Sequence, residues 1–297
     1  MTPGDDAGLG ARLREARQRF SVEFSPAHDE ATARRQWAAV QRLQELRPVF
    51  ASVTYGAGGG SRDGTVELAG RLHRETDVLP LAHLTAVGQS TAELREVLRA
   101  LARAGVREVL ALRGDPDGDP GAPWEAHPEG LEHADELVAL ARAEGMRSVG
   151  VAAFPAGHPE SPDLDTDTRH LLAKLRAGAD FAIAQLTFDV EEFLRLRDRV
   201  VAAGRGDVPV LPGLLPLTSP TVLEVSDRLT GGQHPAWLRE RLAGLIDDRD
   251  AFREEGVQIA LESGRRLLDE GVEVLHLYTL NASRTAVRLV EELGLAG

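Results

Sequence analysis

The chain has 297 residues, of which 42% are hydrophobic, and its formal net charge is −13 at pH 7. This acidic balance argues against nucleic acid as a partner, because a nucleic-acid surface needs a basic stripe. The absence of cysteine excludes disulfides, thiolate metal sites and cysteine nucleophiles. No apolar span approaches the roughly 18 residues of a membrane helix, and the acidic N-terminus does not resemble a secretory signal. We therefore expect a cytoplasmic protein without membrane contact.

Eight short apolar runs are spaced along the chain, and stretches rich in Arg, Glu and Ala lie between them. Buried strands that alternate with helices pair in parallel, because a parallel strand is reached only through a crossover. Eight such units without an intervening linker predict one α/β domain over residues 1–297, a closed (β/α)8 TIM barrel, which needs roughly 250 residues. The predicted strands are Ser21–Pro26, Phe50–Gly56, Leu79–Val87, Glu108–Asp115, Ser148–Pro155, Phe181–Phe188, Pro209–Leu217 and Val274–Leu280.

Helix signals recur between these strands. The first predicted helix, Asp29–Leu46, carries Trp37, Val40 and Leu43 at helical spacing, so one of its faces is apolar. Residues 1–10 are expected to form a loose polar tail. Residues 219–271, between the last two strands, have room for at least two helices and are the expected lid or specificity element. Later helices are predicted at Ala92–Ala104, Leu164–Ala177, Val190–Ala203, Thr221–Leu229, Ala251–Asp269 and Arg284–Leu293.

Polar side chains stand near the carboxyl ends of the predicted strands, where barrels of this kind carry their chemistry. Glu23 lies between Val22 and Phe24, so alternation puts it on the opposite face of its strand, which could be the barrel lumen. A buried carboxyl group favours its protonated form and suits a general acid, although a structural ion pair with an arginine is an equal alternative. The strand-end residues are Glu23, Thr54, His83, Asp115, Gln185 and Tyr278.

Two loop segments give weaker signals. Residues Gly56–Arg62 lead into a helix and could offer free N–H groups to an anion, although a plain tight turn is the simpler explanation. Asp117 and Asp119 resemble part of a calcium loop, but Pro120 stands where glycine is required and Ala126 where glutamate is required. We therefore predict a solvated acidic turn there. No histidine has zinc-ligand spacing, so no metal site is predicted.

Lys174 is the only lysine, and it falls in a predicted helix rather than on a strand. A Schiff-base aldolase would place its lysine on a strand inside the lumen, so this position disfavours an aldolase or lyase. Gly114 allows close approach of backbone to a ligand, and Asp115 could accept hydrogen bonds from a heterocycle.

Several motifs in order along the chain resemble those of 5,10-methylenetetrahydrofolate reductases. The resemblance covers about Ser21 to Leu293, and because the chain ends after the barrel it is similar to the short bacterial enzymes without a regulatory domain. The matching segments are Val-Glu-Phe-Ser-Pro at 22–26, Ser-Val-Thr-Tyr-Gly-Ala at 52–57, His-Leu-Thr at 83–85, Ala-Leu-Arg-Gly-Asp at 111–115, Val-Ala-Ala-Phe-Pro at 151–155, His-Pro-Glu at 158–160, Ala-Gly-Ala-Asp-Phe-Ala-Ile-Ala-Gln at 177–185 and Tyr-Thr-Leu-Asn at 278–281.

The resemblance implies an oxidoreductase of one-carbon metabolism and methionine biosynthesis. In this family reduced nicotinamide, here NADH, passes hydride to FAD, and FAD passes it to methylenetetrahydrofolate, giving 5-methyltetrahydrofolate. The family's general acid falls on Glu23, its aspartate near flavin and pterin on Asp115, and its pterin-binding glutamine on Gln185; Tyr278 is expected on the substrate side. The flavin contacts would fall on Thr54, His83, Leu112, Arg113, Gly114, Asp115, Ala152, Phe154, His158, Asp167 and Lys174.

The chain departs from the family pattern mainly in the cofactor clamp. Phe154 stands in place of a flavin-stacking tyrosine, and His170 and Ala173 stand in place of an asparagine and an arginine of the flavin-binding helix. On the substrate side the departures are Val222, Ser226 and Ala282. Two alternatives to FAD-dependent reduction follow. NADH could transfer hydride directly to the folate without flavin, or the barrel could bind folate without turnover.

Overall fold

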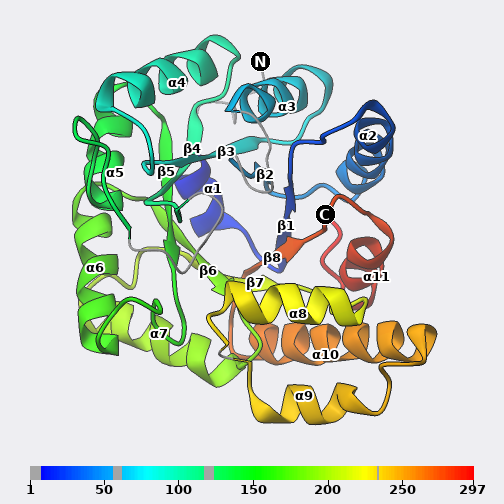
Figure 1. Cartoon of the computed structure of the whole chain (residues 1–297). Coiled ribbons are helices and arrows are strands. Elements are labelled where there is room, and N and C mark those ends of the chain that lie inside the picture. The colour runs from blue at the N-terminus through cyan, green and yellow to red at the C-terminus, as the bar shows by residue number, and fades with distance from the viewer. Residues whose placement is uncertain (1–7, 56–61, 117–123, 233) are drawn as a thin grey trace.

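The computed structural model describes residues 8–55, 62–116, 124–232 and 234–297. Eight parallel strands close into a barrel in sequence order, and helices surround it (Figure 1). This architecture confirms the predicted (β/α)8 fold. The strands are β1 (Arg19–Phe24), β2 (Ala51–Val53), β3 (Pro80–Thr85), β4 (Glu108–Leu112), β5 (Ser148–Ala153), β6 (Phe181–Leu186), β7 (Val210–Leu214) and β8 (Val274–Tyr278).

The helices follow the predicted alternation, with ends that differ from the expected ones by a few residues at most. Asp29, Ser90 and Asp163 cap α2, α4 and α6 through their side chains, which fixes where these helices begin. The helices are α1 (Leu9–Glu15), α2 (Glu30–Gln44), α3 (Arg62–Glu75), α4 (Thr91–Arg103), α5 (Ala134–Ala143), α6 (Leu164–Arg176), α7 (Val190–Ala202), α8 (Pro220–Leu229), α9 (Ala236–Ala243), α10 (Arg249–Asp269) and α11 (Arg284–Glu292).

The barrel lumen is apolar at the end where the strands begin. Leu9 and Leu13 of α1 pack there against a layer of strand side chains that includes Phe50, Leu81 and Leu110. Residues 1–7 lie outside the described residues, but Leu9 and Gly10, which we expected to end a loose tail, begin this helix and are buried. Their apolar contacts explain the difference, because a helix that fills the end of the barrel is ordered by packing.

The segment between β7 and β8 forms three helices, which agrees with the expectation of at least two. Figure 1 shows α8, α9 and α10 together beside β7 and β8. Leu238 and Leu242 of α9 and Phe252 of α10 are buried in one apolar cluster with Leu217, which follows β7. This cluster fixes the insertion next to the carboxyl ends of the strands. No helix in the described ranges is long and apolar enough to cross a membrane.

Candidate active site

The carboxyl group of Glu23 lies inside the barrel, where only 16% of its side chain is exposed. The strand register places it there, because Ser52 of β2 and Tyr278 of β8 are the neighbours of Glu23 across the sheet. Its Oε2 atom is 3.5 Å from Ser52 Oγ and 3.6 Å from His83 Nε2 on β3. No arginine pairs with this carboxylate among the described residues, so the ion-pair alternative gains no support.

His276 is a site residue that sequence reasoning did not identify. Its side chain is fully buried on β8, with Nε2 3.7 Å from Glu23 Oε2 and Nδ1 2.8 Å from Ser21 Oγ. The ring stacks on Phe50, with centroids 5.6 Å apart and planes inclined by 15°. The available signal was strand alternation, since His276 shares a face with Tyr278, which the sequence did identify.

Tyr278 and Gln185 extend this group toward β6. The Tyr278 hydroxyl is 3.5 Å from Gln185 Oε1, and burial, followed by the charge of Glu23, raises the pKa of Tyr278 well above its usual value. Gly213 on β7 makes room for the tyrosine ring, because a Cβ atom there would lie 2.6 Å from Tyr278 Cε2. The β6–β7 register shifts between Ile183 and Leu186, an irregularity that spans Gln185 and can redirect its side chain.

The carboxyl end of β8 is tied to that of β1 through Asn281. The Asn281 side chain accepts a hydrogen bond from Ser25 N at 2.8 Å and donates one to Ser25 O at 2.9 Å. Gln36 of α2 donates to the same asparagine oxygen at 3.0 Å. Asn281 has a φ of 61°, a left-handed conformation that asparagine tolerates better than most residues. These bonds hold the two strands that carry Glu23 and Tyr278 in register.

A second polar group lies at the ends of β4 and β5. Arg113 follows β4 and forms an ion pair with Glu160 at 2.6 Å, while its Nη2 atom is buried without a partner in the described ranges. Trp124 covers the Arg113 guanidinium at 5.0 Å and donates a hydrogen bond to Gly114 O. Gly114 has a φ of 84°, and a Cβ atom there would lie 2.6 Å from Val87, so this turn requires glycine.

Asp115 is exposed directly beyond this turn. Burial, followed by the charge of Arg113, lowers the pKa of His158, and the charge of Asp115 acts in the opposite direction. Asp115 therefore lies within electrostatic range of the Arg113–His158 group. No hydrogen bond or ion pair joins it to Glu23 in the described part of the chain. The structure thus separates the two predicted catalytic residues into two groups around the barrel mouth.

His158 and Asp167 connect β5 to α6. Asp167 is buried and accepts hydrogen bonds from His158 N at 3.0 Å and from Ser161 Oγ at 3.1 Å. The ring of Phe154 meets His158 edge-on, with centroids 4.7 Å apart. Lys174 lies on α6, as expected, and its Nζ atom donates to Ala152 O at 2.6 Å. Burial lowers the pKa of Lys174 to about 8, against the charge of Asp167.

Further predicted contacts lie on β2 and β4 or outside the described residues. Thr54 follows β2, and its Oγ1 atom is buried without a partner among the described residues. Leu112 ends β4 opposite Thr85 and is half-buried. The glycine-rich segment at 56–61 and the acidic residues Asp117 and Asp119 lie outside the described residues.

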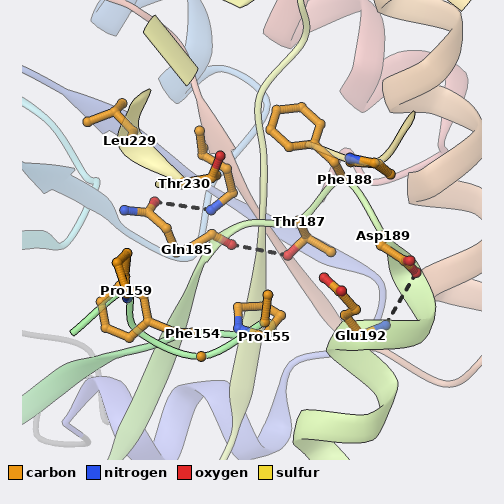
Figure 2. Close-up of a pocket in the computed structure, with 14 residues that line it drawn as sticks. Phe154, Pro155, Pro159, Gln185, Thr187, Phe188, Asp189, Glu192, Leu229 and Thr230 are labelled. Carbon is orange, nitrogen blue, oxygen red and sulfur yellow. Dashed lines mark hydrogen bonds between the residues drawn. The ribbon is translucent and has the colours of Figure 1, made fainter. Parts of the chain in front are cut away.

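A pocket opens between the strand ends and the inserted helices (Figure 2). Gln185 lies on its wall together with Phe154 and Thr230, which come from β6, the β5–α6 loop and the end of α8. Asp189 and Glu192 also line it, and burial, followed by the charge of Asp189, raises the pKa of Glu192. The pocket therefore joins the Glu23 group, through Gln185, to the Phe154–His158 group.

A larger groove of about 460 Å³ lies at the opposite end of the barrel, near the first residues of β7 and β8. Three of its arginines have partners: Arg197 and Arg205 donate to the Glu270 and Leu175 carbonyl oxygens, and Arg17 pairs with Glu273. Among the described residues, buried side-chain atoms without partners occur on His83 and His276, which face Glu23, and on Thr54 and Arg113, which directly follow their strands. We therefore take the Glu23 side as the candidate active site.

The residues present fit a redox cofactor at the barrel mouth only in part. Thr54 Oγ1 and Arg113 Nη2 are buried polar atoms without partners in the described ranges, and a polar ligand would satisfy them. On α6, however, His170 is exposed and Ala173 carries no polar group. Lys174 is left as the cation for a phosphate there, and its ammonium already donates to Ala152 O.

The remaining departures from the family pattern lie in the inserted helices and after β8. Ser226 on α8 is fully buried, donates to Leu223 O and contacts His234 Nε2 at 3.2 Å. Val222 packs against the apolar cluster of the insertion. These two side chains hold the insertion together.

Comparisons with known proteins point to one family. A sequence model of the family described as methylenetetrahydrofolate reductase matches residues 9–294. The 5,10-methylenetetrahydrofolate reductases of Pectobacterium carotovorum and Escherichia coli are each 35% identical over 288 residues, covering 96% of this chain and 94% and 95% of theirs. A Clostridium thermocellum protein that binds two copies of 5-methyl-5,6,7,8-tetrahydrofolic acid has a similar fold, with a TM-score of 0.66, 13% identity and 96% of both chains covered.

The closed barrel with polar groups at its mouth is the architecture of TIM-barrel enzymes, a class that works at the carboxyl ends of its strands. The match over nearly the whole chain gives the particular family. The chain belongs to the methylenetetrahydrofolate reductase family, a family of oxidoreductases whose chemistry implies a flavin or pyridine-nucleotide redox system.

Proposed function

We propose that this protein reduces 5,10-methylenetetrahydrofolate to 5-methyltetrahydrofolate, with reduced nicotinamide as the source of hydride and Glu23 as the proton donor. The observation that carries the proposal is the Glu23 carboxyl group inside the lumen, faced by Ser52, His83 and His276. A folate-binding barrel without turnover has no need of a proton donor in this position. The Clostridium thermocellum protein of similar fold binds 5-methyl-5,6,7,8-tetrahydrofolic acid, which supports a folate as the ligand.

The reaction needs one proton and one hydride. The one-carbon bridge of the folate opens when the departing nitrogen is protonated, which leaves an iminium at the remaining nitrogen. Hydride transfer to the iminium carbon then gives the methyl group. Glu23 supplies the proton, and the low polarity of the surrounding lumen strengthens its effect on the opening bridge.

Binding residues surround this acid. Gln185 presents an amide and Tyr278 a hydroxyl toward the same space, and both are suited to hydrogen bonds with a pterin ring. Asp115 would accept hydrogen bonds from the heterocycle at the β4 end of the mouth. We assign these three residues to the substrate, with Asp115 approaching it from the end of β4 and Gln185 from β6.

We propose FAD as the cofactor, with NADH as the hydride donor. When bound, a flavin accepts hydride from the nicotinamide and delivers it to the folate. Thr54 and Arg113 would satisfy their buried polar atoms on it, Phe154 would cover its ring, and Lys174 would face its phosphates as a point charge. His83, Leu112, Gly114, Asp115, Ala152, His158 and Asp167 would complete the binding site.

Direct hydride transfer from NADH to the folate is the second candidate, and the exposed His170 and the apolar Ala173 on α6 favour it. An absorbance spectrum of freshly purified protein separates the two. Flavin bands, and NADH oxidation that rises when FAD is added, support the flavin route. Undiminished turnover by protein proven free of flavin removes FAD from the mechanism.

The proposed activity itself is tested by the products. Wild-type protein supplied with NADH and methylenetetrahydrofolate, with and without FAD, should form one 5-methyltetrahydrofolate for each NADH consumed. Folate binding without any product under either condition would contradict the proposal and favour the silent folate-binding barrel. Chromatography of the folates with a parallel reading of NADH absorbance provides both numbers.

A further inference from the structure

The two oxygen atoms of the Glu23 carboxyl group have different surroundings. Ser52 Oγ, His83 Nε2 and His276 Nε2 face Oε2 at 3.5, 3.6 and 3.7 Å. No hydrogen bond or ion pair reaches Oε1 from the residues that the structure describes. All three neighbours of Oε2 come from other strands, so the barrel itself makes the two oxygens unequal.

The Glu23 carboxyl group is the acceptor that lies nearest to the Nε2 atoms of His83 and His276 in the described structure. His83 Nε2 and His276 Nε2 are both buried and have no hydrogen-bond partner in the described ranges. A buried N–H without a partner is costly, so an acceptor within reach is favoured. The present distances exceed those of hydrogen bonds, as is common in catalytic sites before substrate tightens them.

The hydroxyl of Ser21 is the hydrogen-bond partner of His276 Nδ1, where it can donate or accept. Ser21 Oγ lies 2.8 Å from Nδ1, and Ser21 has no other side-chain partner among the described residues. If the hydroxyl donates to Nδ1, the ring proton of a neutral imidazole stands on Nε2, directed at Glu23. Phe50 stacks on the ring and Tyr278 meets it edge-on at 5.1 Å, which fixes the ring plane.

We propose that Ser21 and His276 are positioning residues for the proposed reduction, and that with Ser52 and His83 they direct donors at Glu23 Oε2. The transferable proton is thereby kept on Oε1, the oxygen left free for substrate. The same donors stabilise the carboxylate that remains after the proton has left, as donors stabilise a developing oxyanion. This inference rests on the proposed function, because the proton must have the folate as its destination.

The titratable groups that face Glu23 are few. They are His83 on β3 and His276 and Tyr278 on β8, while β2 contributes the neutral Ser52. Burial, only partly opposed by Glu23, lowers the pKa of His83, so this ring is neutral near pH 7. A donor on Oε2 favours the ionised carboxyl group, and loss of a donor must extend the protonated form to higher pH.

The first test is the tautomer of His276, read by NMR of protein with ¹⁵N-labelled histidine. The resonances of His276 are identified as those lost in His276→Phe. Wild-type protein should show the proton on Nε2, and Ser21→Ala, which removes only the hydroxyl, should shift the ring toward a mixture. A wild-type ring protonated on Nδ1 overturns the proposal.

The second test is kinetic. His276→Phe keeps a flat ring on Phe50 but removes the donor, and kcat should fall by about 10- to 100-fold while KM changes less than about threefold. The alkaline limb of the kcat profile should move to higher pH. His276→Gln, which retains a donor, should recover most of the lost kcat, and the exposed His28→Phe should match wild type.

The outcomes separate this inference from the reductase proposal. His276→Phe with kcat within threefold of wild type and an unchanged alkaline limb overturns the positioning role. If this variant does not fold, the same limb measured in Ser21→Ala decides. Wild-type protein that forms no 5-methyltetrahydrofolate overturns the reductase proposal, whereas the tautomer measurement needs no turnover.

Discussion

Lys174 is a cation whose surroundings disfavour its charge. Burial lowers its pKa to about 8, and its ammonium donates to Ala152 O. Between about pH 8 and the ordinary lysine pKa of 10.5, the unfolded chain holds a proton at this site that the folded chain has lost. This lysine therefore opposes folding below pH 8, and that penalty decreases as the pH rises through this window.

Lys174→Met should show this directly. Between pH 7.5 and 9.5 the wild type should gain stability relative to the variant by roughly 1–2 kcal/mol. Urea unfolding at both pH values measures the difference, and titrations elsewhere in the chain cancel between the two proteins. A difference that stays constant with pH would show that Lys174 is solvated.

The sequence identified Glu23 but not His276, for a physical reason. A carboxylate on a strand face is costly unless it is used, so Glu23 draws attention without any knowledge of its neighbours. A histidine within an apolar strand has no such cost when neutral. Its importance comes from the pairing of Ser21 with His276 across the β1–β8 seam, which joins opposite ends of the chain.

At the scale of elements, a glycine on β7, Gly213, leaves the space that the Tyr278 ring on β8 occupies. Gly213→Ala would place a Cβ atom 2.6 Å from Tyr278 Cε2 and 2.7 Å from Ala184 O. We expect the tyrosine ring to be displaced, with kcat/KM for methylenetetrahydrofolate lower by at least about tenfold. Tyr278→Phe is the matched control, since it keeps the ring and removes only the hydroxyl. Equal, small effects in both variants would show that the ring position does not matter.

Helices α8 and α9 are linked through His234, a buried histidine whose neutral form is favoured by burial. His234 contacts Ser226 Oγ and lies 3.5 Å from Asp227 Oδ1, and burial lowers its pKa from 6.5. The unfolded chain therefore takes up a proton here before the folded chain does. The stability from the buried ring is present above about pH 6.5 and is lost as the pH falls below it.

Hydrogen exchange of the α8–α9 peptides at pH 7.5 and 5.5, corrected for intrinsic rates, measures this effect. Protection should fall several-fold more in α8–α9 than in α4, which serves as the internal control. His234→Gln should remove the difference between the two segments. Equal loss of protection in both segments of the wild type would contradict the local role of His234.

The starts of α2 and α6 were predicted to within one residue, and in the structure the side chains of Asp29 and Asp163 cap these helices. The middle helix of the insertion, α9, was not predicted, because its first turn has no side-chain cap and its buried leucines pack on Phe252 of the next helix. Likewise α1 begins with Leu9, and what makes that leucine a core residue is the barrel end that it fills.

In the whole molecule, the apolar layer that stabilises the fold and the polar candidate site lie at opposite ends of the barrel axis. Leu13 of α1 is buried in the apolar layer at one end, and the polar site occupies the other end. Leu13→Ala should cost about 2–5 kcal/mol of unfolding free energy, because it leaves a cavity in this layer. The kcat of the folded fraction should stay within twofold of wild type. Thermal unfolding and initial rates measure the two quantities, and a large loss of kcat would mean that the layers are coupled.

The eightfold alternation made the barrel predictable from sequence, since parallel pairing follows from helical crossovers. The strand register was not predictable in the same way. It pairs Glu23 with Ser52 on one side and Tyr278 on the other, and it leaves Asp115 across the mouth with Arg113 and His158. Those pairings decide which of the strand-end residues act together.

The central claim is that Glu23 supplies the proton that opens the folate bridge. The most direct measurement compares Glu23→Gln with wild type and with Glu45→Gln, an exposed control, in 5-methyltetrahydrofolate formation and in folate affinity. We predict that Glu23→Gln loses turnover by about 10²–10⁴-fold while its Kd for 5-methyltetrahydrofolate changes less than about threefold, and that Glu45→Gln behaves as wild type. A Glu23→Gln protein that forms product within tenfold of the wild-type rate would contradict the account.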